Sequence, residues 1–161
     1  MSDLMDKRTW HRNPERKFLA SIEWQGDCLV WTAGKNKRGY GAIWDGKRMA
    51  MAHRFAWERE HGPIPEGMVI DHVCHTPACV RLEHLRVATP AQNQWNRRPT
   101  AARSGHKNVY PDRGKHCVSI MRNGVRYGGR HDTLEAAVSQ AEALRTELDG
   151  DFAYDNERVS A

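Results

Sequence analysis

Hydrophobic positions in the N-terminal half of the chain fall into short runs separated by polar turns that contain glycine. Residues 28–32 are a run of β-favouring side chains, and residues 39–44 are a second run that we expect to be its hairpin partner. Residues 45–47, Asp-Gly-Lys, predict a tight turn. Residues 50–61 predict a helix, which the glycine- and proline-rich segment 62–67 ends.

The middle of the chain predicts the order strand, loop, strand, helix. Residues 68–72 and 85–88 are short apolar runs, and residues 74–84 between them are a loop that contains two Cys and two His. Residues 89–92, Thr-Pro-Ala-Gln, predict a helix start, because the Thr side chain can accept the Gln amide and the Gln side chain can reach back to the Thr amide. Proline suits the first helical position, because its missing N–H would have no partner there. Residues 97–106 are polar and predict a linker.

After this linker the pattern becomes that of a small sheet with one helix packed across it. Residues 115–122 alternate in character like a strand, and the Asn-Gly pair at 123–124 is a strong hairpin signal before a returning strand. Apolar side chains over residues 134–148 lie on one stripe, which predicts a helix capped by Asp132 or Thr133.

The composition suits a small protein without a membrane segment. The chain has 161 residues, 39% of them hydrophobic, enough for one domain or two small ones with modest cores. No run approaches the roughly 18 apolar residues of a membrane helix. Residues 1–17 are charged and lack the apolar core of a secretion signal, so we expect a cytoplasmic protein. We expect residues 1–16 to be loosely ordered.

The charge distribution favours a polyanionic partner. The chain carries 25 Lys and Arg against 20 Asp and Glu, a formal net charge of +5. Net charge alone is equally compatible with a basic protein that binds no polyanion. The local distribution is more informative, because residues 97–107 carry four positive charges and no acid. Such a stretch is typical of proteins that bind nucleic acid.

Cys74, Cys79 and His84 form the most specific local pattern, each separated from the next by four residues. Disulfides are rare in the cytosol, and thiolates with an imidazole are ligands that zinc prefers, four to a tetrahedral site. Cys28 on the upstream strand is the candidate fourth ligand, and His75 is its rival. The alternative is that these cysteines are free thiols buried as small hydrophobic groups.

A second candidate group lies beside this loop. His72 follows Asp71 at the end of a strand, where an imidazole next to a carboxylate can act as a general base. Asn93 lies one turn into the helix that starts at residue 89, and the three side chains converge if the hairpin packs on that helix. Oxygen ligands such as Asp and Asn suit Mg²⁺. Each residue alone is a weak signal, and Cys117, outside both groups, is expected to be unligated.

Together these residues resemble the HNH endonucleases, and within them the zinc-bearing branch that is similar to the His-Cys box homing endonucleases. The resemblance covers about residues 20–98. The matching segments are 28–32, 39–41, 52–54, 62–67, 71–75, Cys79, 83–85 and Asn93. Family loops often carry Asn-Pro between the second Cys and the His, where this chain has Arg81 and Leu82.

The resemblance implies the ββα-metal fold and a role for each matched residue. His72 matches the general base that activates water, and Asn93 matches the ligand of a catalytic divalent ion, Mg²⁺ or Mn²⁺. Asp71 matches an aspartate that binds this ion in some members, and Arg54 loosely matches a position near the scissile phosphate. The residues that match a structural zinc site are Cys28, Cys74, Cys79 and His84.

Residues 105–156 resemble the plant ethylene-response-factor (ERF) type of DNA-binding domain, in which a three-stranded sheet enters the major groove and a helix braces it. The outward positions Ser119 and Met121 are not the arginines of the plant domains, so DNA binding is expected but not the same base contacts. A purely structural sheet and helix is the alternative. The candidate DNA-contacting residues of the whole chain are Arg97, Arg98, Arg103, Lys107, Arg113, Lys115, Arg122 and Arg126.

The expected protein is therefore of the α+β class, with a zinc-bearing HNH nuclease domain over residues 17–98. A basic linker over 99–106 and an ERF-type DNA-binding domain over 107–156 follow. We expect a metal-dependent endonuclease acting on double-stranded DNA, a homing enzyme of a phage or mobile element that works in the cytoplasm of a bacterial host. Double-strand cutting would favour a homodimer. The alternatives are a non-catalytic zinc-containing DNA-binding protein and a nuclease directed at RNA.

Overall fold

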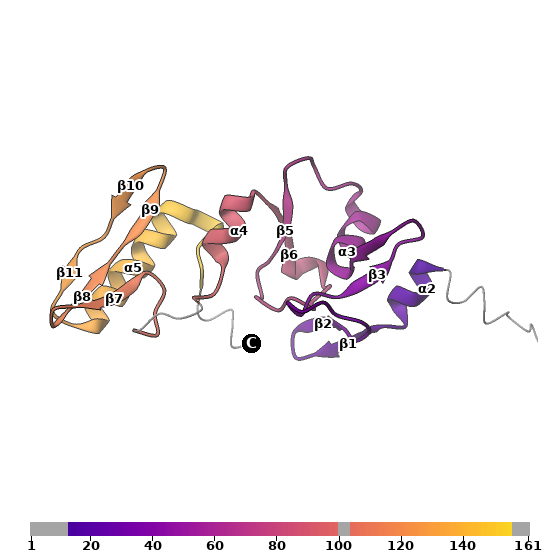
Figure 1. Cartoon of the computed structure of the whole chain (residues 1–161), viewed down its shortest axis with the longest axis horizontal. Coiled ribbons are helices and arrows are strands. Elements are labelled where there is room, and N and C mark those ends of the chain that lie inside the picture. Colours follow the sequence, from indigo (N-terminus) through magenta and orange to yellow (C-terminus); the bar gives the residue numbers. More distant parts are fainter. Residues whose placement is uncertain (1–12, 100–103, 156–161) are drawn as a thin grey trace, which may run out of the picture. The chain divides into compact units, whose positions relative to one another are not determined.

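Short helices and small antiparallel sheets make up two compact units, which confirms the α+β class (Figure 1). The computed structural model describes residues 13–99 and 104–155. One unit contains the described residues up to Pro90, and the other is Ala91–Asp155. None of the helices in the described residues is long and apolar enough to cross a membrane.

The boundary between the units falls at the start of a helix, α4 (Pro90–Asn96), which clusters with the second unit. The predicted domain limits, 17–98 and 107–156, remain predictions. Residues 100–103 of the predicted linker lie outside the described residues, as does residue 156.

The first unit consists of three antiparallel hairpins and two helices. The hairpins pair β1 with β2, β3 with β4, and β5 with β6. The elements are α2 (Pro14–Leu19), β1 (Ile22–Gln25), β2 (Cys28–Trp31), β3 (Ala42–Trp44), β4 (Met49–Met51), α3 (Ala52–His61), β5 (Val69–His72), the 3₁₀ turn η1 (Leu82–His84) and β6 (Leu85–Ala88).

The predicted pairing of residues 28–32 with 39–44 is wrong. β2 pairs with β1 across a turn at Gly26, and β3 pairs with β4 across a turn in which Asp45 Oδ1 accepts the amides of Lys47 at 2.7 Å and Arg48 at 2.8 Å. β1 shows no alternation of buried and exposed side chains, because its last three residues are all exposed. Its sequence, Ile-Glu-Trp-Gln, does alternate apolar and polar residues, but only over four residues, the shortest length at which alternation indicates a strand.

Two predicted boundaries also differ from the structure: the end of the loosely ordered segment 1–16 and the start of the helix predicted over residues 50–61. The expectation that residues 1–16 are loosely ordered is wrong for its end, since α2 begins at Pro14 and the Asn13 side chain caps it by accepting the Arg16 amide at 3.1 Å. Residues 1–12 of that expectation lie outside the described residues. α3 begins at Ala52, because Met49–Met51 is a strand.

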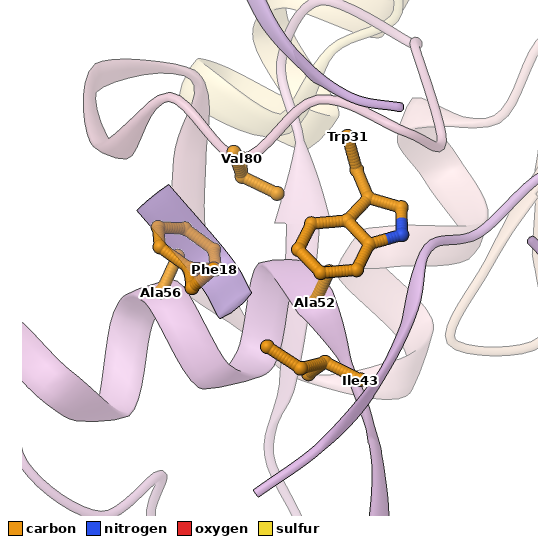
Figure 2. Close-up of a cluster of buried hydrophobic side chains, with 6 residues drawn as sticks. All are labelled: Phe18, Trp31, Ile43, Ala52, Ala56 and Val80. Carbon is orange, nitrogen blue, oxygen red and sulfur yellow. The ribbon is translucent and has the colours of Figure 1, made fainter. Parts of the chain in front are cut away.

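A hydrophobic core joins the helices of the first unit to its hairpins. Trp31 is its largest fully buried side chain, and its indole N–H donates to the Gly34 carbonyl at 3.0 Å. Figure 2 shows the other members gathered around this indole. The buried residues of the cluster are Phe18, Trp31, Ile43, Ala52, Ala56 and Val80.

Gly41 permits this packing, and we expect Gly41→Ala to destabilise the first unit by about 1–3 kcal/mol. A Cβ at this position would lie 2.5 Å from Trp31 Cδ1 and 2.9 Å from Ala52 Cβ, both within the packed core. Thermal unfolding followed by near-UV circular dichroism measures the change. Gly34→Ala is the control, since a Cβ there meets nothing within 4 Å, and an equal loss in both variants would contradict the packing explanation.

The second unit contains α4, five strands and one long helix. β8 lies between β7 and β11 in a three-stranded sheet, and β9 pairs with β10. Besides α4, the elements are β7 (Val109–Asp112), β8 (Lys115–Val118), β9 (Ile120–Arg122), β10 (Val125–Tyr127), β11 (Arg130–His131), α5 (Leu134–Asp149) and the 3₁₀ turn η2 (Gly150–Phe152).

Local signals predicted the helix and the hairpin turn of this unit correctly. Thr133 caps α5 by accepting the Ala136 amide at 3.2 Å, and Asn123 and Gly124 both have the positive φ of a tight hairpin turn. The predicted continuous strand 115–122 is wrong, because it breaks at Ser119 into β8 and β9.

The strand breaks because the backbone of two other segments hydrogen-bonds to it at this point. The Ser119 amide bonds the Asn108 carbonyl at 3.0 Å, and the Val118 amide bonds the Gly129 carbonyl at 2.8 Å. The backbone comes so close here that a Cβ on Gly128, whose φ is +135°, would lie 2.1 Å from the Val118 carbonyl oxygen. Ser119 therefore pairs outside the strand, which sequence alternation does not reveal.

Candidate functional site

Three cysteines and one histidine of the first unit lie close enough together to share a metal ion. The Sγ atoms of Cys28, Cys74 and Cys79 and a ring nitrogen of His84 all lie within 4.8 Å of one another. His84 Nδ1 is 3.6 Å from both Cys28 Sγ and Cys79 Sγ. Tetrahedral zinc with its usual bond lengths separates a nitrogen and a sulfur ligand by about 3.6 Å. The structure thus brings together the four side chains that the sequence assigned to zinc, and His75 is not in the group.

Backbone pairing between β2 and the loop after β5 brings these ligands together. The Trp31 amide donates to the Ala78 carbonyl and the Val80 amide to the Leu29 carbonyl, each at 2.8 Å. Cys79 therefore lies opposite Val30 on β2, in an isolated antiparallel bridge. This pairing places Cys79 beside the strand that begins with Cys28.

The ionisation of the three thiols fits a bound cation. A hydrogen bond with Cys79 lowers the pKa of Cys74 to about 4, and the same bond raises the pKa of Cys79. Burial raises the pKa of Cys28. Without a cation, these shifts favour ionisation of one thiol and oppose ionisation of the other two. A divalent cation compensates the negative charge of several thiolates at once. The donor set fits zinc on these grounds.

Asp27 orients the histidine of this cluster, and the sequence analysis did not identify it. His84 Nε2 donates to Asp27 Oδ2 at 3.0 Å, which leaves the lone pair of the neutral ring on Nδ1, the atom that faces the sulfurs. Arg81 donates to the same carboxylate and to the Asp27 carbonyl oxygen, and its hydrogen bond lowers the pKa of Asp27. Arg81 is one of the two residues at which this chain departs from the family's loop. Here it supports the histidine ligand through Asp27.

We expect Asp27→Asn to weaken zinc binding by about 10- to 100-fold, the usual effect of losing a carboxylate that orients a metal-bound histidine. Competition with a chromophoric chelator at neutral pH measures the affinity. Glu23→Gln is the control, because Glu23 is an exposed acid on neighbouring β1. If both variants retain wild-type zinc affinity, Asp27 has no role in orienting His84.

His72 ends β5 and is held by the backbone of the metal loop. Its Nε2 donates to the Cys79 carbonyl oxygen at 3.0 Å, and the side chain is buried. Since a carbonyl only accepts, the neutral ring has its hydrogen on Nε2 and its lone pair on Nδ1. Burial lowers the pKa of His72, which favours this neutral form. The side chain therefore has the protonation state that a general base requires.

Asp71, next to His72, is fixed by an arginine on the neighbouring strand. Arg86 lies opposite Asp71 in the β5–β6 pair and donates from Nε to Asp71 Oδ2 at 2.9 Å, and its Nη2 lies 2.8 Å from the same oxygen in an ion pair. Asp71 is buried, and this ion pair holds its carboxylate in place. Arg86 was not singled out in the sequence, where one basic residue on a short strand carries no distinguishing signal.

Two further rings surround His72. The His53 ring on α3 lies 4.7 Å from the His72 ring in an edge-on contact, and the Tyr40 ring lies 5.9 Å from that of His72. Burial lowers the pKa of His53 to about 3, so His53 is neutral. Both residues lie in segments that carried the family resemblance, but no pattern around them predicted a role for either.

The other predicted catalytic residues, Arg54 and Asn93, lie on two different helices. Arg54 is half-buried on α3 and lines a hollow together with Arg48, Met51 and Glu58. Asn93 is half-buried on α4 and therefore belongs to the second unit. Its convergence with Asp71 and His72 remains a prediction.

The predicted DNA-contacting residues differ in exposure. Lys107 and Arg122 are engaged in contacts inside the second unit, and Arg103 lies outside the described residues. The exposed ones are Arg97, Arg98, Arg113, Lys115 and Arg126. Among these, Lys115 forms an ion pair with Asp132 at 2.7 Å on the surface.

Comparison with known proteins places this geometry in a family. Residues 50–95 match the family model of the HNH endonucleases. The chain is 34% identical over 104 residues to protein 3.8 of Escherichia phage T7, which covers 63% of the chain and 86% of that protein. The chain belongs to the family of phage T7 protein 3.8 and carries an HNH endonuclease domain.

Two further relatives are viral. Protein 7.7 of phage T7 is 40% identical over 67 residues, 42% of the chain and 52% of that protein, so the chain spans about half the length of this relative. A protein of Acanthamoeba polyphaga mimivirus named uncharacterized HNH endonuclease L560 is 30% identical over 128 residues, 78% of the chain and 66% of that protein. No solved structure matches the chain.

The match to the HNH domain covers most of the candidate residues. It begins at β4 and ends within α4, so it includes Arg54, Asp71, His72 and Asn93. Three of the four zinc-type residues also fall within it, and Cys28 does not. The HNH domain is that of a metal-dependent nuclease family, and its match extends past the boundary between the two compact units.

Proposed function

We propose that the chain is a metal-dependent endonuclease that hydrolyses phosphodiester bonds of double-stranded DNA. The observation that carries the proposal is that the His72 ring is buried, neutral and held in one tautomer. The Cys79 carbonyl fixes the tautomer of His72, burial keeps it neutral, and Asp71 lies next to it within a segment that matches the HNH nucleases. A neutral imidazole with a defined lone pair is the group that a hydrolase needs to activate water.

The proposed reaction uses His72 as the base. Its Nδ1 removes a proton from water, whose oxygen attacks phosphorus in line with the 3′ oxygen. The bond from phosphorus to the 3′ oxygen breaks, and solvent protonates that oxygen, so the products are a 5′ phosphate and a 3′ hydroxyl. A Mg²⁺ or Mn²⁺ ion, when bound, stabilises the negative charge on the phosphate and on the leaving oxygen.

Oxygen ligands for such an ion are available on the proposed residues. Asp71 offers a carboxylate that Arg86 holds in place through Oδ2, and Asn93 offers an amide oxygen. Hard oxygen ligands are those that Mg²⁺ prefers. Arg54 is proposed to contact the phosphate, as guanidinium groups commonly do. The zinc site is proposed to be structural, since four protein ligands leave no open position for substrate.

The second unit is proposed to bind DNA. Its exposed basic side chains supply the charge that phosphate contacts require, and residues 105–156 resemble the ERF-type domain. We propose a phage or mobile-element homing enzyme, and the relatives in phage T7 and mimivirus support the viral part of this proposal. A homodimer would supply the second active site that double-strand cutting needs.

A plasmid assay tests the proposal. Supercoiled DNA is incubated with the full chain and Mg²⁺ or Mn²⁺, and open-circular or linear product that excess EDTA prevents is the expected result. A parallel reaction with labelled RNA separates DNA from RNA specificity. Salt-sensitive DNA binding with no product on DNA or RNA under either ion would instead support the rival function, a zinc-containing DNA-binding protein without catalysis.

A further inference from the structure

We propose that Lys107, Arg122 and Asp149 are positioning residues that hold α4, the helix carrying Asn93, on the C-terminal module. By C-terminal module we mean the described part of the second unit after α4, residues 104–155. The proposal rests on the proposed function only in taking Asn93 as a catalytic ligand. It assigns to this module a part in building the nuclease centre in addition to its proposed binding of DNA.

Lys107 binds the C-terminal end of α4. Its Nζ donates to the Trp95 carbonyl oxygen and, at 2.6 Å, to the Arg97 carbonyl oxygen. The last carbonyls of a helix have no partner within the helix, and a cation at this end also interacts favourably with the helix dipole. The ammonium group lies 4.9 Å from the centre of the Tyr154 ring, which comes from the end of the module. Lys107 thus connects the last turn of α4 to residues far along the chain.

Arg122 and Asp149 form a second connection to the same helix. Arg122 Nε and Nη2 each donate to one oxygen of Asp149 at 2.6 Å, a bidentate pair in which the Asp149 side chain is fully buried. The Arg122 guanidinium lies 4.7 Å from the centre of the Trp95 ring on α4. Asp149, at the end of α5, therefore fixes the arginine that packs on α4.

A fourth charged residue extends the cluster. Arg145 on α5 is buried and donates from Nη1 to the Lys107 carbonyl oxygen at 3.0 Å. Burying so many charges is costly unless each is paired, so these residues form a cooperative group in which the loss of one member affects the others. Burial, followed by the positive charge of Arg145, lowers the pKa of Lys107 to about 8.

The location of the charged cluster distinguishes its role from that of the apolar core, which stabilises the module. The sheet and α5 already share an apolar core, whose buried members are Val109, Val118, Ala137 and Ala141. The charged cluster lies elsewhere, where Trp95 and Arg97 of the α4 segment meet the module. Its contacts with Trp95 and Arg97 are therefore among those that attach α4 to the module.

These contacts also indicate a different role for Lys107 and Arg122, which the sequence predicted to contact DNA. Only 12% of the Arg122 side chain is exposed, and the Lys107 ammonium is occupied by backbone carbonyls. A phosphate contact would require an exposed cationic group. The two roles give different results in DNA binding, because removal of one phosphate contact reduces the salt slope of binding by about one.

The test is Lys107→Met in the full chain, which removes the ammonium group and keeps a similar unbranched side chain. Hydrogen exchange of the α4 backbone amides, DNA affinity with its salt slope, and kcat and KM of cleavage at several Mg²⁺ concentrations are measured. Arg130→Met is the matched control. It also removes one positive charge from the same unit, where Arg130 forms a half-exposed pair with Asp112 at 3.1 Å.

We expect exchange of the α4 amides to accelerate about tenfold or more in Lys107→Met, with kcat reduced about 10- to 100-fold, as for small misplacements of catalytic groups. KM for DNA and the salt slope should match those of Arg130→Met, and part of the lost kcat should return at high Mg²⁺. If Lys107→Met does not fold, Trp95→Ala, which removes the arginine contact from the α4 side, is measured in the same way.

The results separate the proposal from its alternatives. Unchanged α4 exchange in the folded variant overturns it, and so does a salt slope reduced by about one, which would make Lys107 a phosphate contact. If the wild-type chain cleaves nothing, the proposed function fails. The exchange data alone then decide whether the cluster holds α4.

Discussion

His72→Ala is expected to lower the cleavage rate of supercoiled DNA by at least about 100- to 10,000-fold, the usual contribution of a general base, and so to abolish detectable product. DNA affinity should stay within about twofold of wild type, because the proposed DNA contacts are exposed basic residues elsewhere on the chain. The physical reason is that His72 alone in this group combines burial, a neutral ring and a fixed tautomer. Its Nε2 is committed to the Cys79 carbonyl oxygen at 3.0 Å, so Nδ1 is the proton acceptor.

Initial rates of plasmid cleavage and fluorescence anisotropy of labelled DNA measure the two quantities in the same preparation. Removing a buried ring also leaves a cavity, so His72→Gln, which retains most of the volume, is measured beside the alanine variant. His61→Ala is the control, because His61 is exposed at the end of α3, where its ring packs beside that of Trp57 with ring centres 4.2 Å apart. Cleavage by folded His72→Ala at the wild-type rate would exclude His72 as the base.

Removal of zinc is expected to unfold the first unit. The cluster joins β2 to the loop after β5, and the hydrophobic cluster around Trp31 has six buried members among the described residues. Zinc binding in small domains contributes about 10–16 kcal/mol to folding, whereas whole domains are stable by only about 5–15 kcal/mol. The binding free energy lost with the ion is therefore comparable to the whole stability of a unit of this size, or larger.

Two treatments should give the same result, a strong chelator and the variant Cys79→Ser. Near-UV circular dichroism should lose the signal of Trp31, which is fully buried in the core, and zinc content measured by atomic absorption should fall to below one ion per chain. Cys117→Ser is the control, since Cys117 lies in the second unit, outside the cluster. An unchanged melting curve for Cys79→Ser would show that the cluster does not stabilise the fold.

The sequence by itself determined the features that depend on local chemistry. Asn123 and Gly124 predict their turn because few residues accept positive φ, and Thr133 predicts a helix start because its side chain can accept an orphan amide. Cys74, Cys79 and His84 predict a metal cluster because thiolates and imidazole at that spacing have few other uses. In each case the residue type carries the information, wherever the rest of the chain lies.

Only the tertiary structure decided the features that depend on partners distant in sequence. β1 was missed because its alternation of apolar and polar residues extends over only four positions, and its pairing with β2 became visible only in the fold. Asp27 and Arg86 were missed because a positioning ion pair looks like a surface charge in a sequence. Lys107 and Arg122 show the same limit, since basic residues at a predicted DNA surface are instead held by backbone carbonyls and by Asp149. A charge is recognisable from its residue type, but its role is set by what lies opposite it in the folded chain.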